Sequence, residues 1–249
     1  MRSLTIAMIS AAALAAPAIA QDTTRKIHPV AGDVYLFQNN FHNSLLVATP
    51  EGVVRVDPIN AEAGAWLNEN LSEISDQPVT HLIYSHSHLD HASGGSAHPD
   101  AEVIAHENAP AEIDGVAPDV RVGDEQTIEF GGKTIELTYL GPGHGEDMLA
   151  VVVRPENVAF IVDVAAPNRL PYQNFGGANI DQWMDQIKAA QALDFEIFAP
   201  GHAVVGEKAD LDTALQYMVD LKEGVKAGLE AGKSVEEIQA ELTLDPYMN

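Results

Sequence analysis

The residues with the clearest chemical potential are four metal-competent side chains within six positions, in a segment that reads His-Ser-His-Leu-Asp-His. His86 and His88 are two residues apart, so an extended backbone projects both imidazoles to one side. Asp90 and His91 follow in the next turn and can face a neighbouring position. Zinc takes imidazole and carboxylate ligands in proteins. The segment therefore predicts one metal ion and allows two, and the alternative is a solvated polar loop.

Three later residues have the same ligand chemistry and similar surroundings. His144 lies in a Gly-Pro-Gly-His-Gly turn, Asp163 ends an apolar segment, and His202 follows Pro-Gly. Each follows a predicted strand, where side chains converge on the mouth of a site, and the glycines allow tight turns. Each alone would be an ordinary turn residue, but with the first segment they complete a predicted ligand set. The chain has no cysteine, so its metal ligands must be histidines and carboxylates.

Short apolar and β-branched segments separated by turn residues predict the elements that hold these side chains. We expect strands at 34–37, 44–48, 52–56, 79–84, 102–105, 126–130, 134–139, 148–153, 158–162 and 196–199. We expect helices at 61–74, 180–193, 210–231 and 234–242. Strands followed by helix, twice, predict an α+β fold in which two sheets pack face to face with helices outside.

The ordered set His-x-His-x-Asp-His, Gly-Pro-Gly-His, strand-end Asp and Pro-Gly-His resembles the metallo-β-lactamase superfamily, from about Val34 to His202. The resemblance implies a four-layer αβ/βα sandwich of two mixed sheets with outer helices. It implies two zinc ions per chain, with iron or manganese as alternatives. The implied ligands are His86, His88 and His144 for the first ion and Asp90, His91 and His202 for the second, with Asp163 bridging both. Asp57 matches the family's early strand-end Asp and is expected to orient a ligand, with a simple turn residue as the alternative.

The implied chemistry is hydrolysis by a metal-bound hydroxide. Two divalent ions would lower the pKa of a shared water to give hydroxide, and would polarise the carbonyl that this hydroxide attacks. Asp90 is the expected catalytic residue, because it can orient the nucleophile and pass a proton to the leaving group. The expected function is a secreted binuclear zinc hydrolase that cleaves a carbonyl ester, lactone, thioester or amide.

Several other functions remain open. The commonest lactamases have Cys where Asp163 stands, and Asp there is similar to glyoxalase II-type thioesterases and lactonases. A periplasmic β-lactamase is the first alternative, and a non-catalytic or redox-relay accessory metal-binding protein is another. An iron-dependent oxygenase also fits the ligand types. Glyoxalase II itself is disfavoured, since the C-terminal region has no evident basic cluster.

Two segments are expected to flank the metals and bind the substrate. They are residues 39–42 and the fourteen residues 166–179, whose lack of periodicity is typical of a functional loop. Phe41, Tyr172 and Phe175 are candidates for an apolar wall, with plain packing as the alternative. Arg169 is a candidate for a substrate carboxylate, with a surface ion pair as the alternative. The other histidines are left outside the set: His28, His42, His81, His98 and His106.

Composition predicts where the protein works and which partners it avoids. The apolar run at 4–16 and the Ala18-Ile19-Ala20 site predict a signal peptide at residues 1–20, and hence a periplasmic or secreted protein. The remaining residues, 21–249, are expected to form one domain. A net charge of −24 disfavours nucleic acid and anionic membranes. We therefore expect a small-molecule substrate and no membrane attachment after cleavage; the oligomeric state is not predicted.

Overall fold

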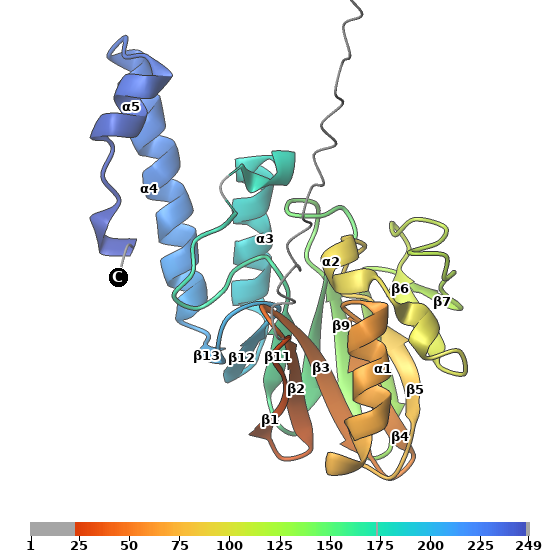
Figure 1. Ribbon diagram of the computed structural model, residues 1–249. Coiled ribbons are helices and arrows are strands. Elements are labelled where there is room, and N and C mark those ends of the chain that lie inside the picture. The colour runs from red at the N-terminus through yellow and green to blue at the C-terminus, as the bar shows by residue number, and fades with distance from the viewer. Residues whose placement is uncertain (1–22, 173, 248–249) are drawn as a thin grey trace, which may run out of the picture.

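The computed structural model describes residues 23–172 and 174–247 and shows two β-sheets packed face to face with helices on their outer surfaces (Figure 1). This is the expected four-layer arrangement. The predicted signal peptide, residues 1–20, lies outside the described residues. Among the residues described, no helix has the length and apolar character needed to cross a membrane.

The first sheet has seven strands that lie in sequence order. They are β1 (Arg25–Ala31), β2 (Val34–Asn39), β3 (His42–Thr49), β4 (Gly52–Val56), β5 (Val79–Ile83), β6 (Glu102–His106) and β7 (Val120–Val122). The pairs from β1 to β4 are antiparallel, and those from β4 to β7 are parallel. Helix α1 (Ala61–Asn70) covers the outer face of this sheet, where Leu67 packs in one apolar cluster with Phe37 and Leu46.

The second sheet has six strands in the order β13-β12-β11-β10-β9-β8. They are β8 (Glu125–Phe130), β9 (Lys133–Tyr139), β10 (Leu149–Arg154), β11 (Val158–Ile161), β12 (Ile197–Pro200) and β13 (Gly206–Glu207). Helices α3 (Ile180–Ala192) and α4 (Asp210–Glu230) cover its outer face through Trp183, Leu211 and Met218. The short α5 (Val235–Glu241) lies against the far half of α4, away from the sheets (Figure 1).

The apolar core explains why the strands end where they do. Along β10, Val151 and Val153 face the other sheet, while Ala150 and Val152 face the helices. Alternate residues of a strand point to opposite faces, so a strand covered on both sides is apolar throughout. Polar residues therefore appear where the strands leave the core, and these strand ends carry the candidate site.

The structure also contains elements that the sequence did not predict. Strands β1, β7 and β13 were missed, as was the four-residue helix α2 (Leu89–Ala92). The helix expected at 61–74 ends at Asn70 and continues as a single 3-10 turn, Leu71–Glu73. Polar, partly exposed β1 and the very short β7, β13 and α2 carry too little apolar periodicity to be recognised.

Candidate metal centre

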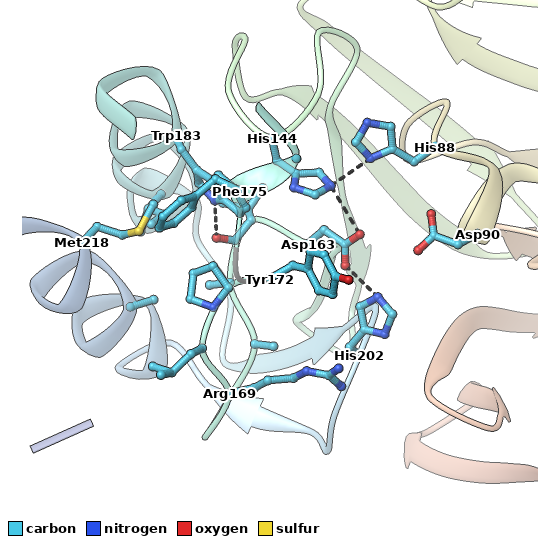
Figure 2. A pocket seen from close by; sticks show the side chains of 18 of the residues that line it. His88, Asp90, His144, Asp163, Arg169, Tyr172, Phe175, Trp183, His202 and Met218 are labelled. Carbon is cyan, nitrogen blue, oxygen red and sulfur yellow. Dashed lines mark hydrogen bonds and ion pairs between the residues drawn. The ribbon is translucent and has the colours of Figure 1, made fainter. Parts of the chain in front are cut away.

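The seven predicted ligands come together at one edge of the two sheets. Figure 2 shows the side chains of His88, Asp90, His144, Asp163 and His202 converging on one region. The first motif leads from β5 into α2, and the later ligands follow β9, β11 and β12 in turn. The strand ends of both sheets thus supply the cluster.

Three of the ligands form a first group. The donor atoms of His86, His88 and His144 all lie within 4.8 Å of one another. His88 Nδ1 is 2.9 Å from His144 Nε2, and the two rings meet edge to face. This grouping is the one that the resemblance implies for a first ion.

A second group lies beside it and has one member more than expected. The donor atoms of Asp90, His91 and His202 lie within 4.8 Å of one another, together with that of His42. His91 Nε2 is 3.1 Å from His202 Nε2. His42 was predicted to lie outside the ligand set, whereas the structure places it inside this group.

Asp163 lies between the two groups. Its Oδ2 is 3.4 Å from His144 Nε2 and 3.3 Å from His91 Nε2. Its Oδ1 is 3.1 Å from His202 Nε2. Burial raises the pKa of this carboxyl, but contacts with the three histidines outweigh burial and hold the pKa well below its usual range. The carboxylate is therefore charged and placed to contact both groups.

The donor set fits one divalent ion in each group. Donor atoms around one zinc ion lie roughly 3.0–3.6 Å apart, because each bond is about 2.0–2.2 Å. The separations given above, 2.9–3.4 Å, are close to that range. His86 Nε2 is buried beside Asp163 Oδ2 at 3.8 Å and has no hydrogen-bond partner. Burial lowers the pKa of His86 well below its usual value, so the ring is neutral and can offer a lone pair to a metal.

Asp57 holds two of these histidines from behind. It is fully buried, and it accepts hydrogen bonds from Ser85 N at 2.8 Å and Ser85 Oγ at 2.7 Å. Ser85 Oγ is in turn 3.0 Å from His86 Nδ1, and Asp57 Oδ2 is 3.7 Å from His91 Nδ1. Burial raises the pKa of Asp57 to about 6, against the opposing effects of His91 and Ser85. Asp57 is therefore placed to orient His86, through Ser85, and His91.

This network determines which nitrogen of His86 carries the proton. An ionised carboxylate can only accept, so the Ser85 hydroxyl donates to Asp57. Ser85 Oγ must then accept from His86 Nδ1–H, which leaves the Nε2 lone pair facing the cluster. A hydrogen bond to the outer nitrogen fixes the tautomer of a ligating histidine in this way.

Gln186 on α3 holds the turn that carries His144, and it was not among the predicted site residues. Its Oε1 accepts from His144 N at 2.7 Å, and its Nε2 donates to Gly141 O at 2.6 Å. A Cβ on Gly143 would lie 2.3 Å from Gln186 Oε1, so a larger residue there would push Gln186 out of these hydrogen bonds. The signal was present in the sequence as a polar residue within the buried stripe of α3.

Comparisons with known proteins identify the family of this chain. A family model for the metallo-beta-lactamase superfamily matches residues 38–202. The chain belongs to this superfamily. The alpha subunit of 2,4-dinitroanisole O-demethylase from Nocardioides sp. (strain JS1661) is 27% identical over 70% of the chain, which spans only 56% of that protein. A metallo-beta-lactamase type 2 from Bacillus sp. (strain 170) is 27% identical over 67% of the chain and 68% of its own length.

The metallo-β-lactamase fold is confirmed by a solved structure. A metallo-beta-lactamase from Pontibacter korlensis superposes with a TM-score of 0.67, covering 78% of this chain and 99% of its own, at 22% identity. Hydrolases are frequent in the superfamily, so the comparisons support a hydrolase-like protein. Its histidine and aspartate groups could hold a metal ion.

In this superfamily member a cavity of about 730 Å³ opens beside the candidate ligands. The predicted wall residues Phe41, Tyr172 and Phe175 all line it. Trp183 and Met218 extend its apolar surface beside Phe175 (Figure 2). Trp183 packs edge to face on both Phe175 and the candidate ligand His144. The apolar wall and the candidate ligands therefore belong to one continuous surface.

Arg169 also lines this cavity and is exposed. The ion pairs found among the described residues do not include it, so the surface ion pair that the sequence left open is not formed there. Its guanidinium extends toward His202 (Figure 2). A positive charge at the cavity is thus available to an anionic group.

Proposed function

We propose that this protein is a binuclear zinc hydrolase that cleaves a small carbonyl compound, namely an ester, lactone, thioester or amide. The observation that carries the proposal is the Asp163 carboxylate, which lies between two groups of metal-competent donors at the side of an apolar cavity. Bound divalent ions supply Lewis acidity, which lowers the pKa of water toward neutrality and polarises a carbonyl oxygen. Iron or manganese are the alternative metals for the same donors.

Asp90 is the proposed proton carrier. Its side chain is 52% exposed and lines the cavity, unlike the buried His91 beside it. Contact with His42 is the largest effect on the Asp90 carboxyl and lowers its pKa, so the group is ionised at neutral pH. An ionised carboxylate at the cavity can accept a proton at Oδ1 or Oδ2 and return it to the leaving group.

The cavity favours substrates that combine an apolar part with an anionic part. Tyr172, Phe175 and Met218 can cover the apolar part, and Arg169 can meet a carboxylate. A cavity of about 730 Å³ suits a small molecule. The negative net charge disfavours a nucleic-acid partner. We propose action in the periplasm or outside the cell, on the basis of the pattern in residues 1–20.

A β-lactamase is the second candidate. It is favoured by Arg169 at the cavity, since β-lactams carry a carboxylate, and by the similarity to a Bacillus protein named for that activity. An accessory metal-binding protein without turnover is the remaining alternative and is an outcome of the test below.

The test is turnover by purified protein loaded with zinc against a panel of substrates. The panel contains aryl esters, acyl-homoserine lactones of several chain lengths, lactoylglutathione, nitrocefin and 2,4-dinitroanisole, the last because of the demethylase relative. We expect hydrolysis of an ester or lactone that chelator abolishes, zinc restores and Asp90→Asn lowers at least 100-fold. Asp185→Asn, an exposed carboxylate on α3, is the matched control. Two-zinc protein that turns over nothing supports the accessory role, and turnover that survives metal removal contradicts the proposal.

A further inference from the structure

His42 is held in place more firmly than an ordinary turn residue. It begins β3, and its backbone pairs with that of His202 as an isolated antiparallel bridge between the two sheets. Asn43 N donates to Gly201 O at 2.7 Å, and Asn43 Nδ2 donates to Ala203 O at 2.9 Å. His202 Nδ1 lies 2.7 Å from Phe41 O on the other side. These contacts fix the His42 backbone relative to a candidate ligand.

The ring of His42 faces the second group. Its centroid is 4.6 Å from that of His202 and 5.2 Å from that of His91. The side chain is 25% exposed and lines the cavity. His42 therefore lies on the open side of the group, facing the space that the other donors surround.

The distance from His42 to Asp90 suits a shared ion better than a direct hydrogen bond. His42 Nε2 is 3.4 Å from Asp90 Oδ2. An N–H···O hydrogen bond is about 2.7–3.2 Å long, whereas two donors around one zinc ion lie roughly 3.0–3.6 Å apart. The donor atoms of His42, Asp90, His91 and His202 all lie within 4.8 Å of one another.

We propose that His42 is a direct ligand of the second metal position, in addition to Asp90, His91 and His202. With Asp163 this position has five protein donors, one more than the first. The inference rests on the proposed metal centre, but it concerns a residue outside the superfamily motif found in the sequence.

The experiment measures metal binding without substrate. Metal-free wild type, His42→Ala and His42→Gln are titrated with zinc against a chromophoric chelator, and with cobalt while the visible spectrum is recorded. His202→Ala gives the scale for losing a ligand. His28→Ala, a strand histidine that contacts Gln38 instead, is the matched control. Thermal unfolding of the metal-free proteins checks that each variant is folded.

We expect both His42 variants to weaken the second zinc equivalent more than 100-fold, to leave the first unchanged and to alter the cobalt spectrum. Loss of an outer group that only orients a ligand costs about 10–100-fold. A loss below 100-fold, or an unchanged cobalt spectrum, therefore overturns the inference and leaves the binuclear site intact. If wild type binds no second equivalent, the proposed function fails as well.

Discussion

Replacing Asp57 with Asn tests whether the buried network behind the ligands controls metal binding. The exchange preserves shape, and the amide oxygen can still accept from Ser85 N, now 2.8 Å from Asp57 Oδ1. The amide nitrogen must then occupy the place of Oδ2, facing Ser85 Oγ and His91 Nδ1. Because an amide nitrogen only donates, Ser85 Oγ becomes an acceptor there and turns its own proton toward His86 Nδ1.

The expected magnitude follows from this reversal. His86 would carry its proton on Nε2, the atom that faces the cluster, and His91 Nδ1, 3.7 Å from Asp57 Oδ2, would lose the negative charge behind it. Loss of such outer partners costs about 10–100-fold in metal affinity, or about 1.4–2.7 kcal/mol per position. We expect Asp57→Asn to weaken both zinc equivalents by this amount, one through each histidine.

The assay is zinc titration against a chromophoric chelator, with thermal unfolding of the metal-free protein to check the fold. Asp119→Asn is the matched control, because Asp119 also accepts a backbone N–H, from Val103 at 2.9 Å, but belongs to neither donor group and does not line the cavity. If Asp57→Asn folds and binds both equivalents with wild-type affinity, the tautomer argument is refuted.

Three further outcomes follow from single residues. Gln186→Leu should lower the free energy of unfolding by about 1–3 kcal/mol and weaken the first zinc equivalent, measured by denaturant melts and titration, because the His144 turn loses its hydrogen bonds. Burial, with the charge of Arg55, lowers the pKa of His98 to about 3. In the unfolded chain His98 is protonated as the pH falls below about 6.5, whereas in the folded chain it stays neutral down to about pH 3, so the free energy of unfolding falls over this range. His98→Gln should therefore reduce the decrease in the free energy of unfolding between pH 7 and pH 4 by about 3 kcal/mol, as measured by urea melts. Arg169→Met should raise KM about tenfold for carboxylate-bearing substrates and leave kcat and neutral substrates unchanged in steady-state assays; an equal effect on neutral substrates would contradict the assigned role.

The sequence predicted most strands to within one residue at each end, and this includes β9, whose burial alternates along the strand. The strand expected at 52–56 is found at Gly52–Val56, and those expected at 134–139 and 158–162 differ by one residue at one end. Apolar segments bounded by turn residues determine β4 and β11 locally, and alternating apolar residues determine β9. The ends of β9 and β11 therefore lie close to where the sequence predicts them, and so do His144 and Asp163, which follow these strands.

His42 could not be found in the same way, because its position depends on pairing between distant segments. It reaches the second group through contacts with residues 201–203, about 160 positions away, and no local spacing encodes that bridge. Gln186 is different, since a glutamine between buried Trp183 and Ile187 already marks a polar group that needs partners. Long-range register, rather than residue type, limited what the sequence could predict.

The most direct test of the binuclear centre is a crystal structure of zinc-loaded protein with anomalous data at the zinc edge. The account predicts two anomalous peaks, one among His86, His88 and His144 and one beside His91 and His202, with the Asp163 carboxylate between them. A single peak, or an Asp163 side chain turned away from both positions, would contradict it.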